Sequence, residues 1–238
     1  MGDKQVSEFE ETSTGIYNLT KFTMLDFQGK LSCIIWFSGC NMKCQYCHNK
    51  ELVESRGHLS LSYIKEFLES RVGKLEGVVL SGGEATLYKK LPELARYIKD
   101  LGFKVKLDTN GTNTKMVKHL IDEGLVDYIA LDYKATKEKF QEVTKCKLWD
   151  KFQETLSLLI ANNHKVPFEV RTTWHTSLLT KSDVEVIIED LNSKGYENTF
   201  YLQKCNPVDN SLAFAILPQS DDIKHVKLKG LQVPVEFR

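Results

Sequence analysis

Three cysteines stand close together in one short stretch of the chain. Cys40, Cys44 and Cys47 have the spacing CxxxCxxC within the stretch Gly39 to Asn49, and no fourth cysteine follows nearby. A cubane iron-sulfur cluster normally takes four cysteine ligands, so three thiolates would leave one iron open to another ligand. The spacing therefore predicts a metal site with one free coordination position.

Two other readings of the cysteines compete with this one. A structural zinc site needs four nitrogen or sulfur ligands, and His48 directly after Cys47 could supply the fourth. Adjacent residues rarely complete one tetrahedron, however, and the chain has no second ligand pair at finger spacing. The third reading is that the cysteines are inert, which we expect of the scattered ones, Cys33, Cys146 and Cys205.

Composition limits the class of protein. The chain has 238 residues, with Lys plus Arg at 32 and Asp plus Glu at 32, so nothing favours binding to nucleic acid or to an anionic membrane. Its apolar runs, residues 34–37 among them, are too short to cross a bilayer, and its first residues do not form a secretory signal. We therefore predict a cytoplasmic protein with reduced cysteines. We expect a polar lead-in over residues 1–15 and a single domain over 16–238.

Strand and helix patterns alternate along the chain. Short apolar runs predict strands, and apolar residues at helical spacing predict helices between them. Six strands joined by helices imply parallel pairing with right-handed crossovers. The expected fold class is α/β, a partial (βα)6 TIM-like barrel with parallel strands and an active site at their C-terminal ends. The tail after Leu217 reads as a helix or an edge strand. The expected strands are 31–37, 77–80, 103–107, 126–131, 166–170 and 199–202, and the expected helices are 61–72, 91–101, one around 116–121, 148–163 and one around 184–191.

Polar or glycine residues follow each predicted strand. Because parallel strands present their C-terminal ends on one face, these segments are expected to converge on one mouth. Loops are polar in any case, which would explain part of the pattern but not three cysteines in one loop. After the cysteine loop, the segments are 81–84, 108–111, 132–134, 171–175 and 203–207.

Taken together, these features resemble the radical S-adenosylmethionine (SAM) superfamily. The resemblance consists of the CxxxCxxC triplet, an aromatic residue (Tyr46) just before the third cysteine, and Gly-Gly-Glu ending the second strand. It implies one [4Fe-4S] cluster whose open iron is chelated by the amino and carboxylate groups of SAM. The reduced cluster would cleave SAM, and the resulting 5′-deoxyadenosyl radical would abstract a hydrogen atom. Ala85 stands where family members often have proline.

The resemblance also assigns roles to residues after the other strands. Lys134 could pair with the SAM carboxylate, with Asp132 near its amino group, and Gln203 could contact the ribose hydroxyls. Arg171 fits SAM or partner binding equally with a structural ion pair. Asp108, Thr109 and Asp132 could form a monovalent-cation site. The predicted cluster ligands are Cys40, Cys44 and Cys47, and the predicted cofactor-binding residues are Tyr46, Ser81, Gly82, Gly83, Glu84, Asp108, Thr109, Asp132, Lys134, Arg171 and Gln203.

Within the superfamily, three segments most resemble the activating proteins of anaerobic ribonucleotide reductases. They are Cys47-His48-Asn49 and residues 168–175 and 201–207. This implies a glycyl radical enzyme as partner and a flavodoxin- or ferredoxin-type electron donor. An enzymatic alternative is a small-molecule radical enzyme such as 7-carboxy-7-deazaguanine synthase. A non-enzymatic alternative is an iron-sulfur electron carrier or a zinc-stabilised interaction module, which would not need the Gly-Gly-Glu motif.

Overall fold

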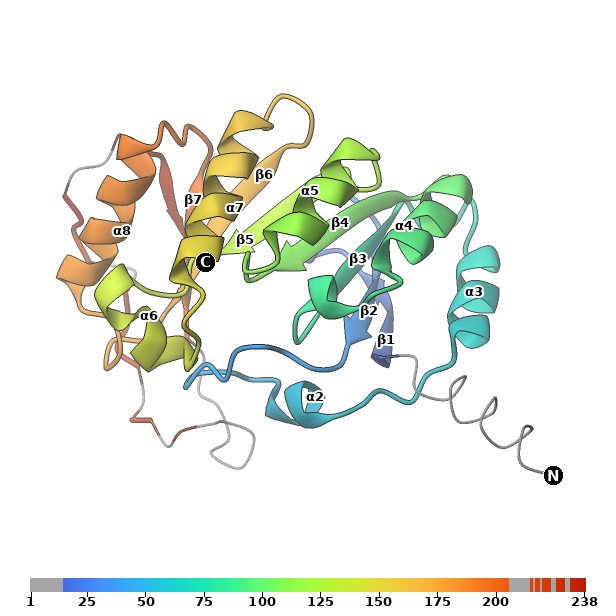
Figure 1. The fold of residues 1–238 in the computed structure, drawn as a ribbon, viewed down its shortest axis with the longest axis horizontal. Helices are drawn as coiled ribbons and strands as arrows, with labels where there is room; N and C mark the ends of the chain where they lie inside the picture. Colours follow the sequence, from blue (N-terminus) through green and yellow to red (C-terminus); the bar gives the residue numbers. More distant parts are fainter. Residues whose placement is uncertain (1–14, 206–214, 216, 219, 224–225, 230–231) are drawn as a thin grey trace. The chain divides into compact units, whose positions relative to one another are not determined.

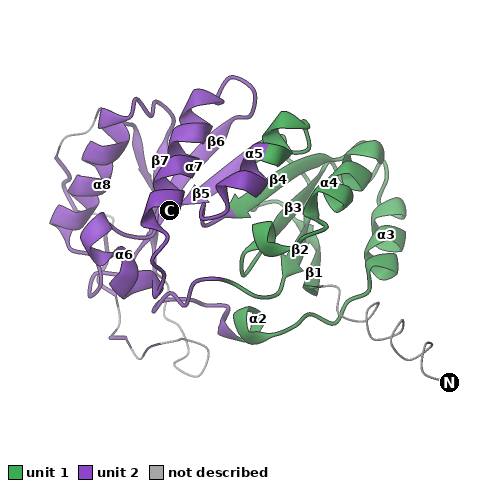
Figure 2. Cartoon of the chain, in the orientation of Figure 1, with its two compact units in different colours: residues 1–40, 51–108, 119–128 green, residues 41–50, 109–118, 129–238 purple. Residues whose placement is uncertain are grey.

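The computed structural model describes residues 15–205, 215, 217–218, 220–223, 226–229 and 232–238. The predicted lead-in, apart from Gly15, lies outside this range. The chain divides into two compact units, and each unit is made of three segments that are separate in the sequence (Figure 2). Unit 1 comprises residues 1–40, 51–108 and 119–128, and unit 2 comprises residues 41–50, 109–118 and 129–238.

Unit 1 is built on four neighbouring strands, in the order β1-β2-β3-β4. β1 pairs antiparallel with β2, whereas β2, β3 and β4 are parallel. Strands β2 and β3 are buried on both faces over most of their length, as expected for parallel strands covered by helices. Helices α3 and α4 flank these strands (Figure 1). The elements are β1 (Ile16–Thr23), β2 (Ser32–Phe37), α2 (Lys50–Glu54), α3 (Leu61–Glu69), β3 (Gly77–Gly82), the short helix η1 (Ala85–Leu87), α4 (Leu91–Asp100) and β4 (Lys104–Thr109).

Local sequence explains where these helices begin and end. The Ser60 side chain accepts a hydrogen bond from the Tyr63 amide and so caps α3. Helix α4 has Pro92 in its first turn and is followed by Gly102, whose φ of +90° is easy only for glycine. Both helices bury one apolar face, which accounts for most of their stability.

A small apolar cluster packs on one face of the unit 1 strands. Phe27, Ile34 and Val79 are buried together, with Trp36 and Tyr128 packed against them. The register sets Ile34 opposite Val79 and Val79 opposite Lys106, so these residues share a face. We call this face the inner face of unit 1. Ser81 and Asp108, two residues beyond Val79 and Lys106, lie on it too.

Unit 2 continues the strand and helix alternation with parallel pairing from β5 to β8. Helices α7 and α8 lie against strands β6 and β7 (Figure 1). Helix α8 begins with a capping box, in which Thr180 and Asp183 satisfy each other's backbone amides. The elements are α5 (Thr114–Asp122, shared with unit 1), β5 (Tyr128–Asp132), α6 (Lys137–Thr144), α7 (Trp149–Ala161), β6 (Phe168–Trp174), α8 (Lys181–Ser193), β7 (Phe200–Lys204) and β8 (Val235–Phe237).

All six predicted strands and all five predicted helices are present, with ends shifted by a few residues. The described residues add β1, α2, η1, α6 and β8. These additions are short or lie outside the repeating pattern, so periodicity alone did not reveal them. In the tail, the structure places a three-residue strand beside β7. No helix among the described residues combines the length and apolar character needed to cross a membrane.

Candidate functional site

In unit 2, the cysteine loop is hydrogen-bonded to the C-terminal end of helix α6. The Lys43 amide donates to the carbonyl of Thr144 at 2.9 Å, and the Gln45 amide donates to the carbonyl of Val143 at 3.1 Å. The Gln45 side chain also donates to the Glu142 carbonyl at 3.0 Å. Because the last carbonyls of a helix have no partner inside the helix, they are available to hold another segment. Helix α6 therefore positions the backbone between Cys40 and Cys47.

Side-chain amides fix the start of the same loop. Asn110 Nδ2 donates to Asn41 Oδ1 at 2.9 Å, and Asn41 Nδ2 donates to Thr112 Oγ1 at 2.8 Å. Thr112 closes the ring because its hydroxyl and its amide both donate to Asn110 Oδ1, at 2.6 and 3.0 Å. Thr109 lies in the same segment, where its hydroxyl accepts from the Gly111 amide. The segment after β4 thus braces the residue next to Cys40.

Asp132 lies between two cations at the carboxyl end of β5. Arg171 Nε is 2.6 Å from its Oδ1, and Lys134 Nζ is 2.9 Å from its Oδ2. Burial raises the pKa of the Asp132 carboxyl, but the charges of Arg171 and Lys134 outweigh this and lower it overall. One carboxylate shared by two cations leaves a net positive charge. Such a group suits recognition of a carboxylate that approaches from outside.

Cys44 and Tyr46 lie within the electrostatic reach of this charged group. Burial raises the pKa of the Cys44 thiol to about 11, against the opposing effect of the Lys134 charge. Burial likewise raises the pKa of Tyr46. The Tyr46 hydroxyl is buried and has no hydrogen-bond partner among the described residues. A buried unsatisfied hydroxyl costs about 1–3 kcal/mol, which a bound ligand with a polar atom at this position would recover.

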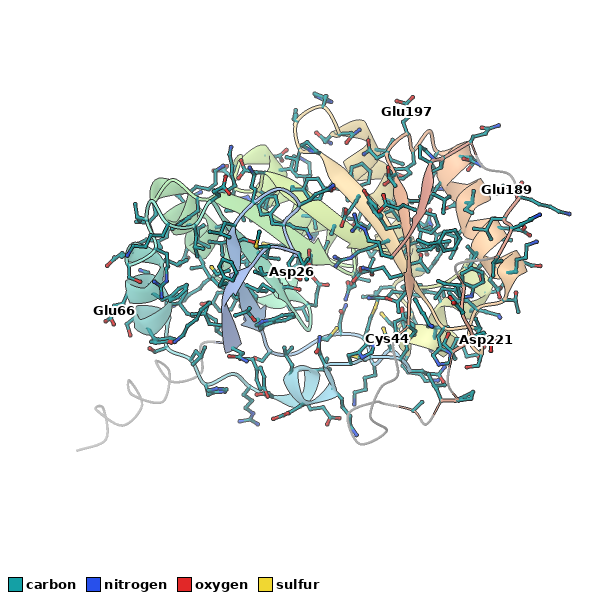
Figure 3. The ribbon with its side chains drawn as sticks, turned by 180° about the vertical axis from the view of Figure 1, so that it is seen from behind. Asp26, Cys44, Glu66, Glu189, Glu197 and Asp221 are labelled. Atoms are coloured by element: carbon teal, nitrogen blue, oxygen red, sulfur yellow. The ribbon has the colours of Figure 1, made fainter. Side chains whose placement is uncertain are left out.

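Cys205 and His48 also lie in this part of unit 2. Cys205 Sγ is 4.0 Å from His48 Nε2, the outer limit for a hydrogen bond to sulfur. Cys44 is labelled in Figure 3, and it precedes a turn in which the Cys47 amide donates to the Cys44 carbonyl at 2.9 Å. None of the six cysteines forms a disulfide. The three cysteines of the loop therefore carry the reduced sulfur that binds a metal as thiolate.

In unit 1, the Gly-Gly-Glu segment fastens the backbone that leads into Cys40. The Gly83 amide donates to the Phe37 carbonyl, and the Glu84 amide donates to the Gly39 carbonyl, both at 2.9 Å. A Cβ atom on Gly82 would overlap the Phe37 backbone, and one on Gly83 would overlap the Gly39 carbonyl group. The absence of side chains here therefore serves the close approach of two protein segments.

The Glu84 side chain has a structural partner of its own. It is 2% exposed, and its Oε1 accepts hydrogen bonds from the Thr86 amide at 3.1 Å and the Thr86 hydroxyl at 2.5 Å. These bonds cap the short helix η1. Glu84 is thus held rigidly at the end of β3, where the sequence predicted a cofactor contact.

On the inner face of unit 1, the Asp108 carboxylate contacts two side chains. Ser81 Oγ donates to Asp108 Oδ2 at 3.1 Å, and Lys106 Nζ lies 3.2 Å from Asp108 Oδ1. Ser81 and Asp108 were predicted site residues, and the structure brings them together. Lys106 was not predicted, although a lysine in the middle of the apolar strand KVKLDT was a visible signal.

One face of the unit 2 sheet, the face that bears Arg171, carries further polar residues. The register aligns Asp132 with Arg171 and Arg171 with Tyr201, and it aligns Thr173 with Gln203. Gln203 therefore follows Tyr201 on the face that bears Arg171. Sequence reasoning missed Glu169 and Arg238. The Arg238 guanidinium lies 3.3 Å from the centre of the Tyr201 ring and 3.7 Å from Glu169 Oε2.

The predicted site residues thus form two groups, one in each unit. Unit 1 holds Cys40, Ser81 to Glu84 and Asp108, and unit 2 holds the others. Among the described residues, no group of three or more His, Cys, Asp or Glu side chains is gathered closely enough to hold a metal ion, so the cysteine ligand set stays a prediction. The donor chemistry nonetheless suits an iron-sulfur cluster, because three cysteines that form no disulfide stand in one loop.

Comparison with known proteins gives one clear family. The profile described as the radical SAM superfamily matches residues 34–200. A Methanocaldococcus jannaschii protein provisionally named a glycyl-radical enzyme activating enzyme is 33% identical over 82% of this chain and 81% of its own length. A Haemophilus influenzae protein with the same provisional name is 32% identical over 44% of this chain and 42% of its own length.

Solved structures share the fold. SuiB of Streptococcus suis matches 78% of this chain with a TM-score of 0.61 and 14% identity. The protein anSMEcpe, solved with bound SAM, matches 71% of the chain with a TM-score of 0.57 and 21% identity. This chain spans 41% and 49% of those two chains. The likeness confirms the predicted fold class, an α/β partial barrel with mostly parallel strands.

Proposed function

Because this chain belongs to the radical SAM superfamily, we propose that it activates a glycyl radical enzyme by abstracting a hydrogen atom from a glycine of that partner. We propose an anaerobic ribonucleotide reductase as the partner. Support comes from the M. jannaschii relative, which aligns over most of both chains and is provisionally named for such activation. The observation that carries the site is the net positive group of Asp132, Lys134 and Arg171, to which Cys44 and Tyr46 couple electrostatically.

Each part of the chain has a separate task in this proposal. Cys40, Cys44 and Cys47 would hold one [4Fe-4S] cluster. The chemistry that a bound cluster would supply, with SAM present and one electron donated, is the formation of a 5′-deoxyadenosyl radical. Helix α6 and the Asn41, Asn110 and Thr112 ring hold the loop that carries the thiols. Rigid positioning of this kind shortens the search for a productive geometry and keeps water from the reacting atoms.

The charged residues would orient the amino acid end of SAM. Lys134 and Arg171 together carry one positive charge more than Asp132 neutralises, so they can accept the SAM carboxylate. Asp132 is then available to the SAM amino group. Ser81 to Glu84 and Gln203 are proposed contacts for the amino group and the ribose.

We propose a flavodoxin- or ferredoxin-type protein as the source of the electron. We also place the protein in the cytoplasm, because six cysteines that form no disulfide suit a reducing compartment.

The unsatisfied Tyr46 hydroxyl leads us to predict opposite effects of its removal on stability and on SAM binding. Tyr46→Phe should raise the melting temperature of the metal-free protein by roughly 2–4 °C, since it removes a buried hydroxyl that costs about 1 kcal/mol. The same change should weaken SAM binding to the reconstituted protein by roughly 2- to 10-fold, because one hydrogen bond is lost. Calorimetry on both forms measures the two effects.

Tyr196→Phe is the matched control. The Tyr196 hydroxyl accepts from the Val170 amide at 2.9 Å and donates to the Thr199 carbonyl at 2.7 Å, so its removal should lower the melting temperature. SAM affinity should not change in this variant. Unchanged SAM affinity in Tyr46→Phe would mean that the hydroxyl does not face SAM.

The proposed activity is tested by anaerobic reconstitution. The protein is reduced, SAM is added, and 5′-deoxyadenosine is measured with and without an anaerobic ribonucleotide reductase while electron paramagnetic resonance spectra are recorded. Cys44→Ala should abolish cleavage and the cluster signal. Cys146→Ala should leave both nearly intact, because Cys146 is a buried thiol outside the predicted ligand set. Equal loss in both variants would contradict the ligand assignment.

The spectra separate the remaining alternatives. A doublet signal that appears only on the reductase supports the proposed function. Cleavage of SAM without such a signal favours a small-molecule radical enzyme, such as 7-carboxy-7-deazaguanine synthase. A cluster without cleavage favours an electron carrier, and bound zinc in place of iron favours an interaction module.

A further inference from the structure

Lys106 is a buried cation in the middle of strand β4. It is 5% exposed, and its neighbours along the strand, Val105 and Leu107, are fully buried. A lysine is almost never this buried unless it is paired, because removing its charge from water is costly. Its position therefore calls for a specific set of partners.

The partners of the Lys106 ammonium group are two oxygen atoms of different kinds. Nζ lies 3.2 Å from the Asp108 carboxylate oxygen Oδ1 and donates to the main-chain carbonyl of Asp26 at 2.5 Å. Asp26, which Figure 3 labels, belongs to the loop after β1. Its own carboxylate accepts from the Thr23 hydroxyl at 2.5 Å, which holds the loop in place.

We propose that Lys106 supplies, from within the protein, the positive charge that a bound monovalent cation would otherwise bring to Asp108. A carboxylate oxygen and a main-chain carbonyl oxygen are the ligand types that hard cations take in proteins. The Lys106 ammonium group already occupies the position between these two ligands. A second cation at Asp108 would be repelled by it at short range.

The same ammonium group also aligns Asp108 for its other contact. Asp108 Oδ2 accepts from Ser81 Oγ at 3.1 Å, and Ser81 lies two residues before Gly83, which approaches the cysteine loop. The Lys106 charge therefore helps to set the end of β3 as well as the end of β4. A structural ion pair alone would stabilise the fold, but a cation added to a variant without Lys106 would then not restore the lost stability.

The test compares cations at constant ionic strength. The full-length protein is measured in potassium chloride, ammonium chloride or tetramethylammonium chloride, with melting of the metal-free form as the first readout. SAM cleavage by the reconstituted form is the second readout, and only this one rests on the proposed function. The variants are Lys106→Ala, which opens space for an ion, and Lys106→Met, which fills the space without a charge.

Wild-type protein should melt at the same temperature and cleave SAM at the same rate in all three salts. Lys106→Ala should melt roughly 6–12 °C lower in tetramethylammonium, with at least half of the loss restored by potassium or ammonium. Its cleavage rate should fall at least tenfold and recover in the same salts. Lys106→Met should show both losses without recovery.

Lys104→Met is the matched control on the same strand. Lys104 is exposed and pairs with Asp127 at 2.9 Å, so its replacement should produce no response to the choice of cation. The double variant Lys106→Met with Asp108→Asn removes both charges, and it should melt higher than Lys106→Met while still failing to respond to cations.

Three results would overturn the proposal. One is a wild-type protein that needs potassium for cleavage, and another is a wild-type melting temperature that rises in potassium. The third is a Lys106→Ala protein that behaves identically in all three salts, which would leave Lys106 a structural ion-pair partner. The wild-type comparison requires no variant, so it stands even if Lys106→Ala does not fold.

Discussion

Gly83→Ala should lower the melting temperature of the metal-free protein by roughly 6–12 °C, equivalent to about 3 kcal/mol. The added methyl group would overlap the Gly39 carbonyl and approach Cys40 Cβ to 3.3 Å. Backbone atoms cannot rotate away as a flexible side chain can, so the end of β3 or the cysteine loop must shift. Iron content after reconstitution should fall in parallel, because the shift reaches the residue that carries the first cysteine.

Gly124→Ala is the control that separates this steric overlap from the backbone strain of replacing a glycine. Gly124 has a φ of +65°, and a Cβ there would meet nothing within 4 Å. Its replacement should therefore cost only about 1 kcal/mol of backbone strain and leave iron content unchanged. If both variants lost the same stability, steric contact with the cysteine loop would not be the role of Gly83.

Asp132→Asn should have the largest effect among the charged residues. It leaves Arg171 and Lys134 side by side without the carboxylate that separates them. Breaking a largely buried ion pair from one side costs about 3 kcal/mol, which is roughly 6–12 °C in melting temperature. SAM binding by the reconstituted variant should be lost as well, since Asp132 is the proposed partner of the SAM amino group. Calorimetry measures both effects.

The pH dependence of unfolding tests the same residue. The pKa of Asp132 is lowered in the folded protein, so its contribution to stability is fully present above the unfolded value of about 3.9. This contribution is lost as the pH falls through the lower, folded pKa. Wild-type protein should therefore lose more stability than Asp132→Asn below about pH 4. Parallel curves for the two proteins would contradict the assigned charge group.

Asp127→Asn is the control for a loss of stability that does not affect SAM binding. Asp127 is also bound by two lysines, with Lys99 at 2.7 Å and Lys104 at 2.9 Å, and it accepts from the Val105 amide at 2.8 Å. Its pKa is likewise lowered, with burial opposing the effect of these donors. The control variant should lose stability but keep SAM binding. Loss of SAM binding in it would show that the Asp132 result reflects unfolding.

The order of the strands and helices, and the residue types of the loops between them, could be predicted from the sequence. The strand and helix alternation follows from the spacing of apolar residues, which is a local property of the chain. The cysteine triplet and the Gly-Gly-Glu segment are likewise readable without a structure, because their residue types and spacing define the chemistry. These features were sufficient to predict the family that the comparisons confirmed.

The contacts that hold those loops become visible only in the folded chain. Helix α6 has eight residues, too few to be stable alone, and its carbonyls carry the cysteine loop through contacts about 100 residues away in sequence. The sequence predicted Gly83 as a cofactor-binding residue, and the structure adds that a side chain at this position would overlap the Gly39 carbonyl group. Lys106 donates to the Asp26 carbonyl only because the fold brings the loop after β1 next to β4. Such contacts depend on segments distant in the chain, and no local pattern records them.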